Sequence, residues 1–330
     1  MTDRVAWIVG AGGLLGAAVR KRCDHQPGLV VVADDALPWD DPPGFAAAVQ
    51  AVANRVVEAA QRRATSICVF WCAGSGTTAS HPAQFDAEER SLEIVMSALG
   101  AAMARAGRRR HDDVLFYASS AGGVYGGAEH PPFTERTSPH PISPYGRSKL
   151  RSERIVADAA HRGGYSLAVG RISNLYGPGQ RLDKPQGLVS QLALAQATGS
   201  PASVYVPLDT LRDYIHVDDC ARKVVDFALR VADQDPNSSS EATKILATGR
   251  AATIGELLGL IHRLTKQRVR VVLGASPHSR LQAVDLRLRS VVMPELDEVE
   301  TIPLPVGVAE TISDVRWRLV SGEQSIRLGG

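Results

Sequence analysis

The sequence predicts an α/β fold, a doubly wound parallel sheet with a smaller mixed α/β lobe toward the C-terminus. Short apolar runs, suited to buried parallel strands, alternate with helical segments through the first half of the chain. Glycine, aspartate, Ala-Gly and Ser-Ser follow successive apolar runs. Because parallel strands end at one edge of a sheet, where ligands bind, these residues are expected to line a common site.

The elements can be justified in order along the chain. Each predicted strand is a short apolar run, and the helices between the strands are longer and often rich in alanine. The predicted strands are Arg4–Val9, Leu29–Ala33, Ile67–Cys72, Val114–Ala118 and Ser166–Ile172. The predicted helices are a segment that reaches about Arg22, then Phe45–Arg63, Phe85–Ala106, Tyr145–His161 and Leu188–Ala197.

A glycine-rich turn connects the first strand to the first helix. Gly10, Gly13 and Gly16 follow the pattern G-x-x-G-x-x-G, with Leu14 and Leu15 between the last two. Positions without side chains let the backbone approach a pyrophosphate, and the following helix offers unpaired N–H groups and the positive end of its dipole. The turn therefore predicts a dinucleotide-binding site.

Two acidic residues, Asp34 and Asp35, follow the second predicted strand. A carboxylate at this place suits the hydroxyl groups of an adenosine ribose and repels a 2′-phosphate. The sequence therefore favours NAD over NADP as the cofactor.

Tyr145 and Lys149 stand at i and i+4 of the helix predicted after Pro144, so both side chains lie on one face. A phenol beside an ammonium group is a poised proton-transfer site. Free tyrosine titrates near pH ~10, so a tyrosine base that works near neutrality needs about 4 kcal/mol of stabilisation. One positive charge at about 4 Å supplies roughly that amount at an effective dielectric near ~20.

The composition excludes several classes of function. The chain has 330 residues, of which 44% are hydrophobic and 22% charged, and its formal net charge is +2. The one basic cluster, at residues 108–111, is followed at once by two aspartates. No apolar run approaches the ~18 residues of a membrane span. We therefore expect no nucleic-acid partner, no membrane anchor and no signal peptide.

The cysteines indicate a reducing compartment. Cys23, Cys68, Cys72 and Cys220 form no paired C-x-x-C pattern. We therefore expect neither a disulfide nor a metal site, and we place the protein in the cytoplasm.

Together these residues resemble the extended short-chain dehydrogenase/reductase family, the nucleotide-sugar epimerases and dehydratases. The likeness covers nearly the whole chain. Its matching motifs are the glycine turn at 10–16, Ser119-Ser120 with Val124-Tyr125-Gly126, Thr134-Glu135, Pro144-Tyr145 through Lys149 with Glu153, Arg171 with Asn174, Tyr176-Gly177-Pro178-Gly179, and Arg212-Asp213-Tyr214 with His216-Val217-Asp218-Asp219.

The resemblance implies roles for individual residues. Tyr145 would be the catalytic acid/base, Lys149 would ease its ionisation and hold the nicotinamide ribose, and Ser120 would hydrogen-bond the reacting oxygen. NAD would be bound by Gly10, Gly13, Leu14, Leu15, Gly16, Asp34, Asp35, Ala73, Gly74, Ser119, Tyr145, Lys149 and Ile172. The substrate, a nucleotide-diphosphate sugar, would be bound by Ser120, Asn174, Arg212 and Arg280.

Two of these assignments have alternatives. The segment after the serines is one residue longer than in the family, so Ser119 and Ser120 compete for the catalytic position. Arg212 suits a diphosphate because its planar donor fork matches phosphate oxygens. Its alternative role is a salt bridge to Asp213 or Asp218.

The chain also departs from the family's pattern. Asp40 follows Asp34 so closely that the usual helix after the second strand is missing. Glu89 stands where relatives place asparagine, and Arg280 is the only candidate for an Arg/Asp pair that contacts the nucleotide. No Asp-Glu pair follows the serines, which argues against dehydration. His216 is interpreted as closing a turn.

We expect a Rossmann domain at 1–173 and 213–235, and a substrate-binding lobe at 174–212 and 236–330. The leading hypothesis is an NAD-dependent nucleotide-sugar epimerase that acts at C4 through a transient ketone. The alternatives are an NAD(P)-dependent keto-sugar reductase and a non-catalytic dinucleotide-binding sensor. A sensor needs only the glycine turn, so retention of serine, tyrosine and lysine argues against it. By the same resemblance we expect a homodimer.

Overall fold

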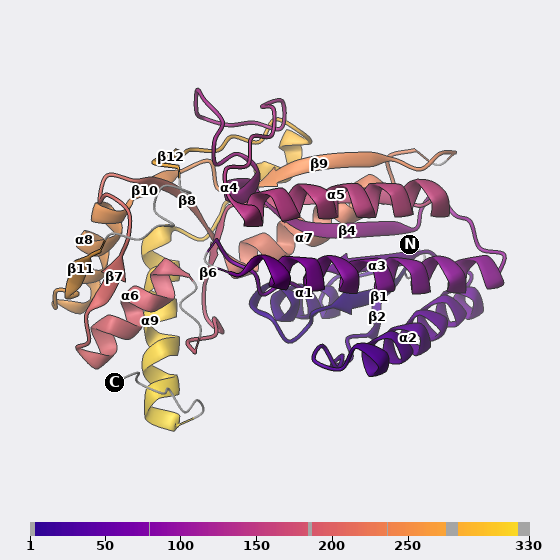
Figure 1. Cartoon of the computed structure of the whole chain (residues 1–330), viewed down its shortest axis with the longest axis horizontal. Helices are drawn as coiled ribbons and strands as arrows, with labels where there is room; N and C mark the ends of the chain where they lie inside the picture. The colour runs from indigo at the N-terminus through magenta and orange to yellow at the C-terminus, as the bar shows by residue number, and fades with distance from the viewer. Residues whose placement is uncertain (1–3, 79, 184–186, 236, 275–282, 323–330) are drawn as a thin grey trace.

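A computed structural model of the protein describes residues 4–78, 80–183, 187–235, 237–274 and 283–322. Its centre is a parallel sheet of six strands in the order β2-β1-β3-β4-β5-β9 (Figure 1). These strands are β1 (Arg4–Val9), β2 (Leu29–Ala33), β3 (Ile67–Trp71), β4 (Val114–Ser120), β5 (Ser166–Ile172) and β9 (Glu241–Leu246). The predicted α/β fold class is confirmed.

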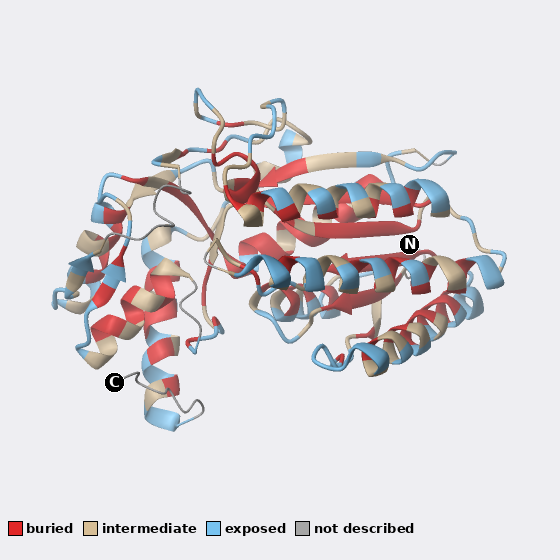
Figure 2. Cartoon of the chain, in the orientation of Figure 1, coloured by how far each residue is buried: buried red, intermediate tan, exposed pale blue. Residues whose placement is uncertain are grey.

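Helices cover both faces of this sheet. One face carries α2 (Pro42–Arg63), α3 (Pro82–Arg105) and α5 (Pro144–Gly163), and the other carries α1 (Leu14–Asp24) and α7 (Val217–Ala232). The inner strands β1, β3, β4 and β5 are largely buried on both sides, as the red interior of Figure 2 shows, whereas the edge strands β2 and β9 are only partly buried. This double burial explains why their sequences read as continuous apolar runs.

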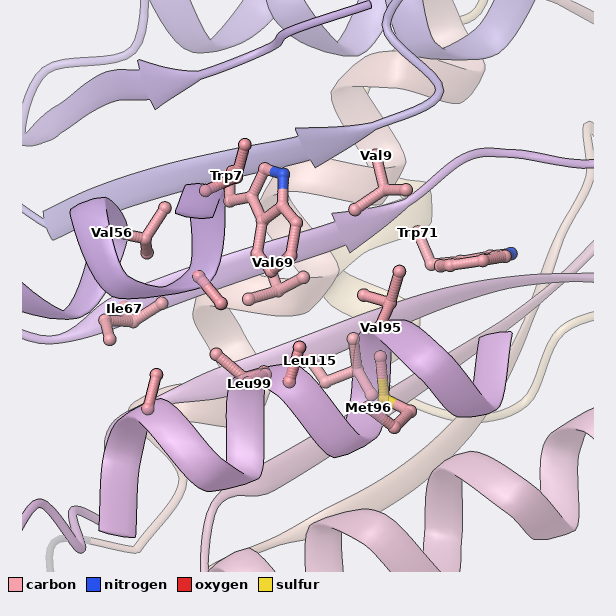
Figure 3. Packing of buried hydrophobic residues seen from close by; sticks show 14 of the residues in the cluster. Trp7, Val9, Val56, Ile67, Val69, Trp71, Val95, Met96, Leu99 and Leu115 are labelled. Atoms are coloured by element: carbon pink, nitrogen blue, oxygen red, sulfur yellow. The ribbon is translucent and has the colours of Figure 1, made fainter. Parts of the chain in front are cut away.

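Successive residues of a strand point to opposite faces, so each strand contributes to two cores. Trp7 and Val69 belong to the cluster under α2 and α3, where they lie near Val56 and Leu99 (Figure 3). Ile8 and its neighbours on β3 and β4 belong to the cluster under α1 and α7. Because helices pack on both faces of the sheet, the carboxyl ends of its strands are held in fixed positions.

A smaller lobe is built from chain segments before and after α7 and β9. Its centre is β8 (Leu211–His216), which pairs with β6 (Asn174–Tyr176), β10 (Ala251–Thr253) and β12 (Asp285–Leu286). A second small sheet joins β7 (Ala202–Val204) to β11 (Val271–Leu273). The surrounding helices are α6 (Leu188–Thr198), α8 (Ile254–Thr265) and α9 (Leu304–Ser321), and the lobe has its own apolar core.

The predicted strands and helices are confirmed, with small shifts at their ends. β3 ends at Trp71, one residue before the predicted end, and β4 continues through Ser120. One boundary was wrong: β9 was predicted to belong to the substrate lobe, but it pairs in parallel with β5 as the sixth strand of the large sheet. Short strands of the large sheet and of the smaller lobe look alike in sequence. Only the strand with which each one pairs shows the unit to which it belongs. The remaining domain boundaries stay a prediction.

The expected loss of the helix between the second and third strands was wrong, because α2 lies between β2 and β3. Residues 34–41 connect β2 to α2, and this longer connection is what the close spacing of Asp34 and Asp40 reflects. All four cysteines are free thiols, and burial raises the pKa of Cys23 to about 12. Within the described residues, no helix has both the length and the apolar character to cross a membrane.

Candidate active site

The glycine turn lies between β1 and α1, against the end of β3. A methyl group at Gly10 would come within 2.7 Å of the Ala73 backbone nitrogen, and Gly10 has a positive φ of +89°. A methyl group at Gly16 would overlap the carbonyl oxygen of Gly10. The fold itself therefore requires glycine at both positions, because the turn, the helix and the next strand are in close contact.

The N-terminus of α1 is open to an anion. Its N-cap is Gly13, which has no side chain to accept from the first-turn N–H groups of Leu14, Leu15 and Gly16. No acidic residue lies in that first turn. Unpaired N–H groups and the positive end of the helix dipole suit a pyrophosphate. These residues therefore fit the diphosphate of a dinucleotide.

The two aspartates after β2 point toward different helices. Asp34 forms an ion pair with Arg20 of α1, and Asp35 forms one with Arg55 of α2. Asp34 is thus the carboxylate turned toward the helix that begins at the glycine turn. Both aspartates lie at the carboxyl end of β2, as predicted.

Tyr145 and Lys149 lie one turn apart at the start of α5. Ser143 caps this helix by accepting a hydrogen bond from the N–H of Gly146 at 3.0 Å, and Pro144 occupies its first turn. The ammonium of Lys149 lies 5.7 Å from the centre of the Tyr145 ring and 5.5 Å from that of Tyr117. The sequence-predicted pair is therefore brought together on one helix face.

The environment of Lys149 keeps it charged. Its Nζ donates to the carbonyl of Ala118 at 3.4 Å. Burial would lower the pKa of Lys149, but Tyr117, Tyr145 and Glu88 outweigh burial and raise it. Lys149 is therefore a permanent positive charge beside the Tyr145 phenol at neutral pH.

The two competing serines have different partners. The hydroxyl of Ser119 donates to Glu153 at 2.5 Å, and Glu153 forms a buried ion pair with Arg171 at 2.7 Å. Ser120 is half-buried and caps the short helix α4 (Ala121–Val124), where its hydroxyl accepts from the N–H of Gly123 at 3.1 Å. The Ser119 hydroxyl therefore gives its proton to a carboxylate, whereas the Ser120 hydroxyl acts as an acceptor and keeps its proton for another partner.

Gly123 connects Ser120 to Tyr145. A methyl group at Gly123 would lie 3.0 Å from a ring carbon of Tyr145. The same glycine donates its N–H to Ser120. Ser120 and Tyr145 therefore both contact Gly123.

Glu89 holds α5 in place. It accepts from the Ser148 hydroxyl at 2.6 Å and forms an ion pair with Arg151 at 2.7 Å. Both partners lie on α5, within one turn of Lys149. Where relatives were expected to have asparagine, this chain has a carboxylate that binds α5.

Sequence reasoning missed Glu88, which organises the loop after β3. Its Oε1 accepts from the backbone N–H groups of Ser75 and Gly76, each at 2.7 Å. Nothing in the local pattern distinguishes Glu88 from other exposed residues of α3. Only its position one turn after Phe85, which packs on Gly76 and Tyr145, could have indicated it.

Arg212 is buried without an acidic partner. Its Nη1 donates to the carbonyls of Leu211 at 2.8 Å and Val284 at 3.4 Å. Within the described ranges, no carboxylate lies at ion-pair distance from it, so the alternative salt bridge to Asp213 or Asp218 is wrong. Burial lowers the pKa of Arg212, with weaker opposing effects of nearby groups. The guanidinium is available to an anion.

The carboxylates near Arg212 are engaged elsewhere. Asp213 accepts from Thr248 and from the backbone N–H of Arg250. Asn174 lies on β6 beside β8 and donates its amide to the carbonyl of Asp213 at 3.0 Å. This bond fixes the strand that carries Arg212.

Arg212 is linked to the serine end of the site through β12. Leu286 of β12 is the register partner of Arg212 and lies 3.5 Å from where a methyl group at Gly122 would be. Gly122 belongs to α4, which begins at Ser120. The candidate anion site and the candidate proton-transfer site therefore meet at this contact.

The remaining predicted residues are placed as follows. Ile172 ends β5, opposite Ser120 in the register. His216 caps α7 by accepting from the N–H of Asp218 at 3.3 Å, so its interpretation as a turn residue is confirmed. Arg280 lies outside the described residues. No group of three potential metal ligands occurs in the part of the chain that the structure describes.

The geometry can be compared with known proteins. The sequence profile of the NAD dependent epimerase/dehydratase family matches residues 6–240. A dTDP-4-dehydro-6-deoxyglucose reductase of Escherichia coli is 26% identical over 205 residues, which are 62% of each chain. A dTDP-glucose 4,6-dehydratase of Streptomyces griseus is 28% identical over 62% of this chain and 59% of its own length. The match thus spans about three fifths of these relatives.

Solved structures share the fold over nearly the whole chain. UDP-glucose 4-epimerase of Stenotrophomonas maltophila, with bound NAD and formylated UDP-arabinopyranose, superposes with a TM-score of 0.75 at 21% identity, covering 97% of this chain and 100% of that one. MoeE5 in complex with UDP-glucose and NAD gives 0.72 at 24% identity, covering 96% and 99%.

Proposed function

The chain belongs to the NAD-dependent epimerase/dehydratase family, and from its site we propose that it epimerises a nucleotide-diphosphate sugar at C4. It is an enzyme, and NAD is its cofactor. The open N-terminus of α1 fits the cofactor's diphosphate, and the proposal is supported by Tyr145 and Lys149, which lie together in the first turns of α5. Bound at these residues, NAD would supply the hydride chemistry at the reacting carbon.

Tyr145 would carry the proton chemistry. Its phenolate takes the proton of the sugar hydroxyl and gives it back after the ketone has turned, while the charge of Lys149 stabilises the phenolate. Ser120 would hold the reacting oxygen. Because Ala121 and Gly122 follow Ser120, no acid pair stands there to eliminate water, which favours epimerisation over dehydration.

The observation that carries the proposal is the buried Arg212, which has no ion-pair partner among the described residues and donates only to backbone carbonyls. A buried guanidinium without an anion is costly, so its retention supports a diphosphate ligand. A diphosphate fixed at Arg212 would give the ketone a pivot about which to turn. Arg212 and Asn174 are therefore the proposed substrate contacts, together with Arg280.

A one-way keto-sugar reductase is the second candidate, supported by the likeness to the E. coli reductase. The two differ in the fate of the hydride. Incubation of the NAD-loaded enzyme with nucleotide sugars deuterated at C4 should give the epimer with deuterium retained and without added NADH. Stoichiometric consumption of added NADH would favour the reductase.

We also propose a cytoplasmic homodimer that forms on the outer face of α3 and α5. A hollow of about 750 Å³ lies there, lined by small residues such as Gly100 and Ala104 with Arg108 and Asp158 at its rim. Small residues let a second helix pair approach closely. Sedimentation should give a dimer for the wild type and a monomer for Ala104→Glu. A dimer in both would place the interface elsewhere.

A further inference from the structure

Glu88 of α3 reaches across the loop after β3. Its Oε1 accepts from the N–H groups of Ser75 and Gly76, each at 2.7 Å, and from the Ser75 hydroxyl at 3.3 Å. These bonds fix the carboxylate, which is only half-buried. A glutamate held by two backbone donors has little freedom to move away from the site.

Gly74 lets this carboxylate face Lys149. A methyl group at Gly74 would lie 3.7 Å from Oε2 of Glu88 and 3.6 Å from Nζ of Lys149. Gly74 also has a φ of +148°, which disfavours any side chain. The two charged groups therefore flank a single glycine, with no side chain between them at that point.

The other groups around Lys149 are neutral or already paired. Tyr117 faces it from β4, and Tyr145 faces it from its own helix. Glu153, one turn further along α5, is bound by Ser119 and Arg171.

The neighbouring acids of α3 face another cation. Glu89 is paired with Arg151, and Asp86 acts on the same arginine. Among the described residues, Glu88 has no cation within ion-pair distance. Among these carboxylates, Glu88 is thus the one near Lys149 whose charge no other cation offsets.

We propose that Glu88 is a positioning residue for the Tyr145–Lys149 pair, and that its charge sets the pH at which the Tyr145 phenol gives up its proton. This inference rests on the proposed acid/base role of Tyr145. The carboxylate offsets part of the Lys149 charge and so opposes formation of the phenolate. An epimerase gains from this balance, because its tyrosine must return the proton that it takes. The effect of Glu88 in raising the pKa of Lys149 has the same origin.

The test follows the phenol directly and needs no substrate. The NAD-loaded protein is labelled with ¹³C at the tyrosine Cζ carbons, and its seven tyrosine signals are titrated by NMR. Tyr145→Phe identifies the Tyr145 signal. Glu88→Gln keeps an oxygen that can accept from Ser75 and Gly76 but removes the charge. Glu89→Gln is the matched control, since its carboxylate is offset by Arg151.

We expect Glu88→Gln to lower the midpoint of the Tyr145 titration by at least about half a pH unit, with a clearly smaller change in Glu89→Gln. An unchanged or raised midpoint in Glu88→Gln, or an equal shift in the control, would overturn the proposal. If Glu88→Gln does not fold, Glu88→Asp is the second variant. Its side chain is one methylene group shorter, which moves the carboxylate away from Lys149, so the midpoint should shift in the same direction. Failure of the enzyme to turn over nucleotide sugars would refute the proposed function but leave this result standing.

Discussion

The hydroxyl of Ser119 donates to the carboxylate of Glu153 at 2.5 Å, so this hydroxyl is already engaged within the protein. The two residues are distant in sequence, and Arg171 completes the buried group from β5. Ser120, the next residue, caps α4 beside the Tyr145 ring. The alternation of side chains along β4 therefore separates a structural serine from a candidate catalytic one.

Substitution of the serines should have different consequences. Ser120→Ala is expected to lower kcat by about 10-fold or more, because the reacting oxygen loses a hydrogen bond. Ser119→Ala should lower the melting temperature, because it leaves a buried Glu153–Arg171 pair without one of its partners. Steady-state kinetics and thermal unfolding of both variants test this. The reverse pattern would assign the catalytic role to Ser119.

Tyr145→Phe should abolish proton transfer while keeping the ring against Phe85 and Gly123. Turnover is expected to fall by roughly 10²–10⁴-fold, the range for a positioned acid/base. NAD affinity, measured by calorimetry, should be nearly unchanged. Retention of more than about a tenth of the activity would refute the role of Tyr145.

Lys149→Ala should move the activity to higher pH. Without the ammonium, the Tyr145 phenolate loses its main electrostatic stabilisation, so it forms only in more alkaline solution. The pH–rate profile of the variant is the measurement. Lys149→Arg keeps the charge and is the control. A profile identical to that of the wild type would contradict the ion-pair argument.

Asp34→Ala should weaken NAD binding by roughly 10-fold, the value of a hydrogen bond to a charged group. It should also strengthen NADP binding, because Arg20 loses one of its two acidic partners and keeps only the longer contact with Asp24, which leaves more of its charge for a 2′-phosphate. Asp35→Ala, whose carboxylate is turned toward Arg55, should have the smaller effect. Titration of each variant with both cofactors decides which aspartate makes the contact, and equal effects would count against the geometry.

Arg212→Met should weaken binding of a nucleotide-diphosphate sugar by roughly 10–100-fold, the loss of a charge-assisted hydrogen bond. Stability should be kept or increased, because burial lowers the pKa of Arg212 and the folded protein holds its charge at a cost. Arg287→Met, at an exposed arginine paired with Asp285, is the control. A large loss of stability with unchanged ligand affinity would make Arg212 a structural residue.

The strands and helices of the cofactor half could be predicted from local patterns in the sequence. Apolar runs mark strands buried on both faces, and the glycine turn, the Ser143-Pro144 cap and the i, i+4 spacing of Tyr145 and Lys149 are local signals. Each of these signals depends on residues that lie close together in the sequence. These features could therefore be predicted from neighbouring residues alone.

The contacts between polar groups could not be predicted in this way, because they form between elements that are distant in the sequence. Glu88 faces Lys149 across Gly74, Ser119 is bound to Glu153, and β9 joins the large sheet beside β5. The partners in each case come from different elements, and their sequences carry no periodic signal for the contact. Charge pairing and strand order depend on how elements pack, since burial and distance decide which groups interact.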